Sequence, residues 1–300
     1  MPEKTTAVSV DLDDLGCYYG VHGVPGQARP YALTCWLPRF LELFETLRIK
    51  ATFFVIGRDL EADLERGGEG AAVLRAAAQA GHELASHSWS HAYDMSVWDE
   101  PRVLEDLQRC DALLREVGGT PRGFRAPGYT HGLPMLQAVA AMGYRYDSSC
   151  LPSPVYYAGK VGVMAAMALR GRRSSSQFRG ARSFVGPLEP YRRTDVDLVE
   201  LPMSVSPVLR LPIIGTTVLG GPDWVRRRLS AAASELPHLH LELHAIDLAD
   251  AMRDGIEAPL PELRVPLATR EARLTALLRG RGESLRLDEL ADRVCGADGR

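Results

Sequence analysis

The sequence has little cysteine and no long apolar run. Its five cysteines are odd in number, widely spaced and without a CxxC pair; they are Cys17, Cys35, Cys110, Cys150 and Cys295. This usage indicates neither a disulfide framework nor a thiolate metal site. No stretch of about 18 apolar residues occurs, so we expect no helix that crosses a membrane.

A strong excess of one charge is also missing. The chain carries 35 Lys and Arg against 38 Asp and Glu, a formal net charge of −3. This balance offers no general attraction to nucleic acid, and we expect no nucleic-acid partner. Residues 1–4 run almost directly into a strand-like segment, without the basic region and apolar stretch of a signal peptide. Together with the cysteine pattern, this predicts a cytoplasmic protein.

What the sequence does contain is an alternation of strand-like and helical segments. We expect strands at 6–12, 51–56, 82–86, 123–125, 144–148, 197–205 and 238–245, and helices at 36–47, 71–80, 101–117 and 133–142. Such alternation predicts an α/β fold with a parallel sheet, open or closed into a barrel. A length of 300 residues fits a single domain, 1–300.

Residues 151–195 interrupt this alternation, and we interpret them as an insertion. Their first part, Val155–Leu169, is apolar except for Lys160 and predicts a helix. The part that follows is rich in arginine: Arg170, Arg172, Arg173, Arg179, Arg182, Arg192 and Arg193. An apolar helix followed by arginines suits either a lid with a solvated basic tail or peripheral contact with an anionic membrane surface.

Two histidines four residues apart, His87 and His91, are the most informative motif. Either one helical turn or a tight loop at a strand end brings both rings to one side. An acid pair, Asp13-Asp14, ends the first strand-like segment. Two imidazoles and one carboxylate are the protein ligands of an open catalytic zinc site.

Other polar residues follow the expected strands in the same relative position. Arg125 to Tyr129 follow the fourth strand, Asp147 follows the fifth, and His244 lies near the end of the last. Ligands and catalytic groups of parallel α/β folds gather at the carboxyl ends of the strands. The shared position is stronger evidence for a site than any one of these residues.

In these motifs the chain resembles the polysaccharide deacetylases, the carbohydrate esterases of family four with the NodB homology domain. The matching features are the Asp13-Asp14 pair, the HSxxH motif at 87–91, the RxPxG-Y loop at 125–129, Asp147, and the Leu-x-His that ends at His244. The resemblance covers about residues 6–150 and 197–250. It implies one catalytic domain folded as a distorted (β/α) barrel of about seven parallel strands.

The resemblance also implies roles. Asp14, His87 and His91 would hold Zn²⁺, or another divalent ion such as Co²⁺. Asp13 would be the general base, paired with Arg125, which Asp147 would orient. The backbone N–H of Tyr129 would stabilise the oxyanion, and His244 would protonate the leaving amine.

Two departures from the usual pattern bear on these roles. The acid run is Asp11-Leu12-Asp13-Asp14, and strand alternation puts Asp11 and Asp13 on one face. An alternative therefore makes Asp11 the base and Asp13 the metal ligand. The second departure is Glu242, whose carboxylate we expect beside His244 and favouring its charged form.

We therefore expect a metal-dependent hydrolase that removes an acetyl or formyl group from the nitrogen of an amino sugar. The substrate is a free amino sugar or a glycolipid; a lipid-linked sugar would place the enzyme in the cytoplasm, at the inner membrane face. Two alternatives remain: an amidohydrolase for a small C–N substrate that is not a sugar, and an inactive module that binds glycans.

Overall fold

The computed structural model describes residues 4–27, 29–176 and 184–297. Arg179 and Arg182 of the expected basic segment lie outside the described residues. Within the described ranges, no helix is both long enough and apolar enough to span a membrane.

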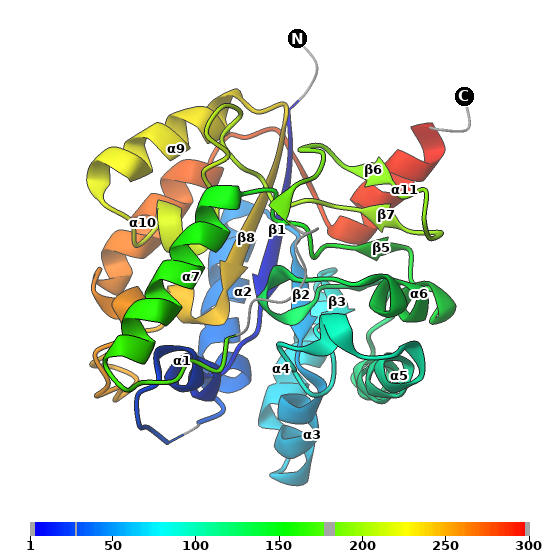
Figure 1. The fold of residues 1–300 in the computed structure, drawn as a ribbon, viewed down its shortest axis with the longest axis horizontal. Helices are drawn as coiled ribbons and strands as arrows, with labels where there is room; N and C mark the ends of the chain where they lie inside the picture. Colours follow the sequence, from blue (N-terminus) through cyan, green and yellow to red (C-terminus); the bar gives the residue numbers. More distant parts are fainter. Residues whose placement is uncertain (1–3, 28, 177–183, 298–300) are drawn as a thin grey trace.

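The centre of the molecule is a curled, mostly parallel β-sheet (Figure 1). Its strands are β1 (Thr5–Asp11), β2 (Thr52–Val55), β3 (Glu83–Ser86), β4 (Gly123–Phe124), β5 (Tyr146–Asp147), β6 (Tyr191–Arg192), β7 (Val199–Glu200), β8 (His238–His244) and β9 (Glu283–Leu285). They run in the order β6-β7-β5-β4-β3-β2-β1-β8, with β9 pairing β1. All pairings are parallel except β6 with β7.

This arrangement confirms the distorted (β/α) barrel expected from the sequence. The described part of the chain has nine strands rather than about seven. The additional strands are β6, which pairs antiparallel with β7 at one end of the order, and β9, which pairs β1 outside that order. The segment after β7 approaches β8, where Ser204 N donates to His240 O at 3.1 Å and His240 N donates to Ser204 Oγ at 2.9 Å. These bonds narrow the opening of the curled sheet.

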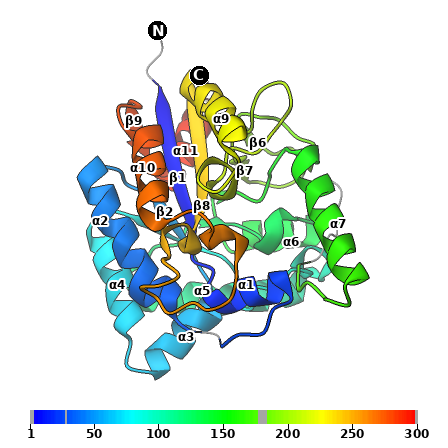
Figure 2. The ribbon, with the colours of Figure 1, turned by 90° about the vertical axis from the view of Figure 1, so that its left-hand side faces the viewer.

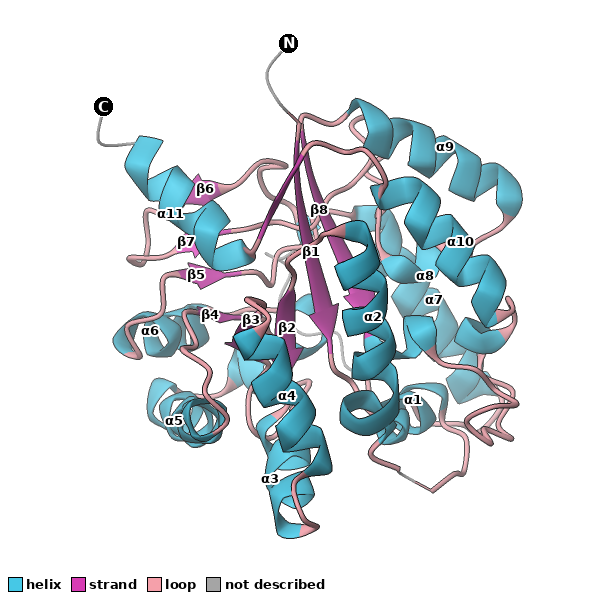
Figure 3. Cartoon of the chain, turned by 180° about the vertical axis from the view of Figure 1, so that it is seen from behind, coloured by secondary structure: helices cyan, strands magenta, loops and turns pink. Residues whose placement is uncertain are grey.

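Helices cover the outside of the sheet (Figure 3). The α-helices are α1 (Leu15–His22), α2 (Leu37–Leu47), α3 (Gly57–Glu65), α4 (Glu69–Gln79), α5 (Glu100–Glu116), α6 (Leu133–Ala141), α7 (Pro154–Leu169), α8 (Gly215–Val218), α9 (Asp223–Glu235), α10 (Leu267–Leu278) and α11 (Leu287–Ala297). A π-helical turn, η1 (Ala32–Trp36), precedes α2, and short 3₁₀ turns are η2 (Met95–Val97), η3 (Pro127–Tyr129), η5 (Ala245–Leu248) and η6 (Pro261–Leu263).

Amphipathic patterns account for the helices that the sequence predicted. In α5, one stripe of side chains at helical spacing is fully buried, namely Val103, Leu107, Cys110 and Leu114, while the other face is solvated. Asp99 accepts a hydrogen bond from the backbone N–H of Arg102 and begins the helix. Phe40 and Phe44 of α2 meet Phe53 of β2 in the main core, with ring centroids of the first pair 5.5 Å apart.

The insertion begins with the expected helix, α7. Ser153 caps it by accepting from Tyr156 N, and Tyr157 Oη donates to Tyr129 O at 2.7 Å. Beyond the helix, Ser174 Oγ donates to Val21 O of α1 at 2.7 Å. Both the first turn of α7 and the segment just after it are therefore bonded to the rest of the molecule, and α7 stands on the side of the molecule away from α2 and α4 (Figure 2).

Candidate metal and catalytic site

The end of β1 and the extended residues directly after it bring two carboxylates to one point at the carboxyl edge of the sheet. Asp11 and Asp13 alternate along the chain, so they face the same side. Oδ1 of Asp13 lies 3.4 Å from Nε2 of His87 and 3.4 Å from Nε2 of His91. Ligand atoms held tetrahedrally at 2.0–2.1 Å from a zinc ion stand about 3.3 Å apart. The observed separations match that value.

A tight loop, not a helix, brings the two histidines together. Ser88 and His91 both have positive φ, 64° and 51°, and Ser88 Oγ accepts from His91 N at 2.9 Å. Nδ1 of His87 lies 2.7 Å from the carbonyl oxygen of Arg125. A backbone carbonyl on one ring nitrogen sets the tautomer and leaves the other nitrogen free for an ion.

The ligand cluster has the polar atoms that an ion would satisfy. Asp13 Oδ1 and His91 Nε2 are buried and accept or donate no hydrogen bond within the described ranges. Buried polar atoms seldom lack a partner. Burial raises the pKa of Asp13, but the charges of His91 and His87, whose Nε2 atoms lie 3.4 Å away, outweigh it and hold that pKa well below its ordinary value. The residues therefore fit a divalent cation.

Asp14 lies apart from this cluster, contrary to the expectation that it is the ligand. Its Oδ1 accepts from the backbone N–H of Tyr31 at 2.9 Å and of Ala32 at 3.3 Å, so it caps the π-helical turn η1. Burial raises the pKa of Asp14 to about 7. The reason is strand alternation, which turns residue 14 away from the face that Asp11 and Asp13 share.

Arg125 pairs with Asp11, not with Asp13 as expected. Its Nη1 lies 2.5 Å from Asp11 Oδ1, and both side chains are buried. Nε donates to Ser148 O, and Nη2 donates to the hydroxyls of Ser148 and Ser9, each at 2.9 Å. The guanidinium also lies over the ring of Phe54, 4.2 Å from its centroid. Contacts with Ser148, Ser9 and Phe54 thus fix the guanidinium of Arg125 in the position where it pairs with Asp11.

Asp147 acts one step further from Arg125 than the sequence predicted. Its Oδ1 accepts from Ser149 Oγ at 2.7 Å, and Ser149 Oγ accepts from the backbone N–H of Ala126 at 2.8 Å. Asp147 therefore positions the loop that follows Arg125, while Ser148 contacts the guanidinium itself. The Asp-Ser-Ser run contained the signal for Ser148, because both serines directly follow the strand-end aspartate.

The backbone N–H of Tyr129, expected to face an oxyanion, is used within its own turn. It donates to Ala126 O at 3.1 Å, and Tyr129 has a φ of 61°. The side chain instead reaches the site, where its hydroxyl lies 3.2 Å from Nε2 of His244. The phenol was not singled out in the sequence, which pointed only to the backbone of this residue.

His244 ends β8 beside Glu242, as the sequence predicted. Nδ1 of His244 lies 2.8 Å from Oε1 of Glu242. Burial lowers the pKa of His244, but the Glu242 carboxylate and its hydrogen bond outweigh this effect and raise that pKa well above 6.5. Ligand atoms of Asp11, Glu242 and His244 lie within 4.8 Å of one another. The acid and the base candidates thus share one small polar centre.

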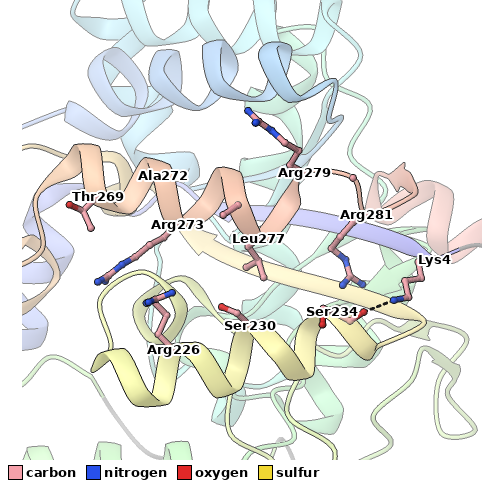
Figure 4. A pocket seen from close by; sticks show the side chains of 12 residues that line it. Lys4, Arg226, Ser230, Ser234, Thr269, Ala272, Arg273, Leu277, Arg279 and Arg281 are labelled. Carbon is pink, nitrogen blue, oxygen red and sulfur yellow. Dashed lines mark hydrogen bonds between the residues drawn. The ribbon is translucent and has the colours of Figure 1, made fainter.

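This centre opens into a cavity of about 540 Å³. The lining includes Asp11, Asp13, His87, Tyr129 and His244. A second cavity, of about 560 Å³, lies between α9 and α10 near the opposite end of β1 (Figure 4). Its described lining has five basic side chains and no histidine or carboxylate. It therefore lacks the histidines and carboxylates that the first cavity brings together.

The chain is similar in sequence to known proteins. The family model described as "Polysaccharide deacetylase" matches residues 25–146. The family model, the curated relatives and the solved structures all support a relationship to the polysaccharide deacetylase family. The chain is 26% identical over 163 residues to the peptidoglycan deacetylase of Helicobacter pylori. It is 28% identical over 116 residues to a chitin deacetylase of Pestalotiopsis sp.

These alignments are partial. The first covers 50% of this chain and 50% of the H. pylori protein; the second covers 38% and 36%. The chain thus matches half or less of the length of these curated relatives.

Solved structures extend the likeness to the whole fold. A Mycobacterium smegmatis protein assigned to the polysaccharide deacetylases superposes with a TM-score of 0.62 at 18% identity, over 99% of this chain and 92% of that one. Puue allantoinase superposes with a TM-score of 0.57 at 17% identity, over 98% and 90%. At such identities the likeness shows the fold alone.

Proposed function

We propose that this protein is a metal-dependent hydrolase that removes an N-acyl group, acetyl or formyl, from an amino sugar. One observation carries the proposal: Asp13, His87 and His91 present three ligand atoms to one point, beside the buried Asp11–Arg125 pair and His244. The family supports sugar deacylation in general. An inactive glycan-binding module would have no reason to keep ligands, base and acid together.

In this proposal Asp13, His87 and His91 hold the ion, Zn²⁺ or another divalent metal such as Co²⁺. When bound, such an ion lowers the pKa of water toward about 7 and polarises a carbonyl oxygen. The assignment replaces Asp14 with Asp13, because Asp14 is used to cap η1. The carbonyl of Arg125 keeps the ring of His87 turned toward the site.

Asp11 takes the role of general base. Its Oδ2 lies 3.8 Å from Nε2 of His87, close enough to receive a proton from a water at the ligand cluster. Arg125 holds the other oxygen, Oδ1, so the carboxylate cannot rotate away. Ser148 and Ser9 in turn hold Arg125, and Asp147 positions the loop behind it. A base fixed in this way keeps the geometry that proton transfer requires.

His244 gives a proton to the leaving amine. Glu242 stabilises the protonated ring through Nδ1, which leaves Nε2 to face the substrate side, near the hydroxyl of Tyr129. Because the N–H of Tyr129 is used in its own turn, we assign the nearby protein donor for the developing oxyanion to the phenol. Within the described ranges, which include all five cysteines, no disulfide joins them; this favours a reducing compartment, and we place the reaction in the cytoplasm.

Metal analysis combined with deacylation assays tests this function. His87→Ala should abolish both the bound ion and the release of acetate or formate from N-acyl amino sugars. His238→Gln is the matched control, because His238 pairs with Thr5 at the other end of β8; it should keep both. Full activity after exhaustive chelation would overturn the proposal.

A further inference from the structure

One wall of the catalytic cavity is largely apolar, which is unusual for a site that binds only sugar hydroxyls. Seven residues of α7 line it: Val155, Tyr156, Gly159, Lys160, Val163, Met164 and Met167. They recur at helical spacing, so one whole face of α7 points into the cavity. Sugar hydroxyls laid on such a wall would lose water without gaining hydrogen-bond partners.

This wall is held in place. Tyr157 ties the start of α7 to Tyr129, and Ser174 and Ser175 tie the segment after it to α1, where Ser175 N donates to Gly20 O at 2.9 Å. Across the cavity, Tyr18 and Val21 of α1 contribute further lining. These bonds hold the apolar face of α7 against the cavity.

The apolar wall continues outward to solvent. Val163 is 57% exposed and Leu169, at the end of the helix, is 90% exposed. From Lys160 to Leu169 the helix rises by about 14 Å. A side chain that is both cavity-lining and exposed marks the mouth, so an apolar chain seated here would extend along α7 toward its end.

One cation interrupts this wall. Lys160 is the only lysine or arginine in the described lining of the cavity. Its Nζ reaches Gly128 O at 3.4 Å, and a Cβ added at Gly128 would lie 3.2 Å from that Nζ and 3.0 Å from the ring of Tyr93. Tyr93 in turn packs on His91, with ring centroids 5.2 Å apart. Lys160 thus lies near the ring of Tyr93, which packs on the ligand His91.

Lys160 also lacks an acidic partner. Among residues 4–27, 29–176 and 184–297, no carboxylate forms an ion pair with it. The remaining acid of the mouth, Glu262, is occupied by His22 at 2.9 Å. Burial alone lowers the pKa of Lys160 to about 8. A half-buried cation without a counter-charge, aimed into a cavity, is suited to bind an anionic ligand group.

We propose that the substrate is an anionic amphiphile: an N-acyl amine whose anionic group contacts Lys160 and whose apolar chain lies along Val163, Met164 and Met167 of α7. The reaction in this proposal rests on the proposed function. The binding surface is inferred from the residues of α7 and does not depend on that function. A phosphate attached to a lipid and a free phosphate would make the same contact with Lys160. The contribution of the ligand's apolar chain must therefore be measured separately from that of its phosphate.

The test is calorimetric titration of the full chain with decyl phosphate, with neutral decyl glucoside and with inorganic phosphate. Decyl phosphate should bind about tenfold more tightly than decyl glucoside, and inorganic phosphate should bind far more weakly than either. Lys160→Met should remove the preference for the phosphate. Arg170→Met is the matched control, because Arg170 is exposed just beyond α7 and does not line the cavity; it should keep the preference.

Two outcomes overturn the proposal: equal affinity for the two decyl compounds in the parent protein, or equal effects of Lys160→Met and Arg170→Met. Met164→Glu places a charge on the apolar wall and should weaken the binding of both decyl compounds. Unchanged affinity in this variant would also contradict the proposal. The readout is binding, so it does not require that the protein deacylate any substrate. Retained binding in a protein that never deacylates would refute the proposed function alone.

Discussion

At the scale of single residues, the decisive feature is which of three neighbouring acids faces the histidines. Asp13 lies 3.4 Å from both rings, Asp11 holds Arg125, and Asp14 caps a turn. If the chain were shifted by one residue at the end of β1, a different acid would face the histidines. The roles of these acids thus depend on the alternation of side chains at the end of one strand.

Substitution of each acid by its amide separates these roles. Asp13→Asn should lose most of the bound ion, because the ligand charge is removed. Asp11→Asn should keep the ion but lower kcat by about 10²–10⁴-fold, the usual contribution of a general base. Asp14→Asn should keep both, since an amide oxygen still caps η1. Metal content and kcat are measured on all three; loss of the ion in Asp14→Asn but not in Asp13→Asn would contradict the assignment.

Glu242 should set the upper pH limit of activity. Its carboxylate raises the pKa of His244, and the general acid works only when protonated. Glu242→Gln removes that charge, so the pKa of His244 falls and activity is lost at a lower pH. The basic limb of the pH–kcat profile should therefore move to lower pH. Glu262→Gln should move it far less, because Glu262 pairs with His22; equal shifts would refute the role of Glu242.

At the scale of elements, the insertion decides what surrounds the catalytic centre. α7 supplies an apolar wall, and the described arginines that follow it, Arg170, Arg172 and Arg173, are exposed. This combination suits an enzyme whose substrate lies in an anionic membrane surface, and we propose peripheral contact there.

Neutralising these three arginines together should weaken binding to anionic liposomes at low salt. Each basic residue near such a surface contributes about 1 kcal/mol, so the partition coefficient should fall by about two orders of magnitude or more. Sedimentation with liposomes measures it, and added salt should also reduce binding. Neutralising Arg226, on α9, is the control. A parent protein that does not bind at all leaves α7 as a wall of the cavity only.

At the scale of the whole molecule, a buried arginine joins α10 to the segment that follows β8. Arg270 of α10 is 2% exposed and donates to the carbonyls of Val265, Ile246, Asp247 and Ala249. Three of these carbonyls belong to the segment that directly follows His244. The end of the chain therefore supports the loop behind the general acid.

Arg270→Met should lower the free energy of unfolding by about 3 kcal/mol, because several buried carbonyls lose their donor. Urea denaturation measures the change. Arg279→Met is the control; Arg279 is exposed, and its loss should cost less than about 0.5 kcal/mol. Similar losses in the two variants would show that Arg270 does not support this part of the fold.

Much of the fold could be predicted because its signals are local. Alternation of apolar segments predicted β1, β2, β3 and the helices α2 and α5 nearly at their observed bounds. The same signals predicted the two-residue strands β4 and β5 and the late strand β8, but they missed the elements at the end of the chain. β9 and α11 were not predicted, since three residues of strand carry no periodicity and their pairing with β1 joins distant parts of the sequence.

The sequence by itself determined the parallel α/β sheet and the residues that gather at its carboxyl edge, because both follow from hydrophobic periodicity and from polar residues at strand ends. It also determined that Glu242 shares a face with His244. Only the tertiary structure decided which acid meets His87 and His91, that Ser148 holds Arg125, and that Lys160 faces the cavity. Those contacts join residues far apart in the chain, and their distances depend on strand register and helix packing, which local patterns do not encode.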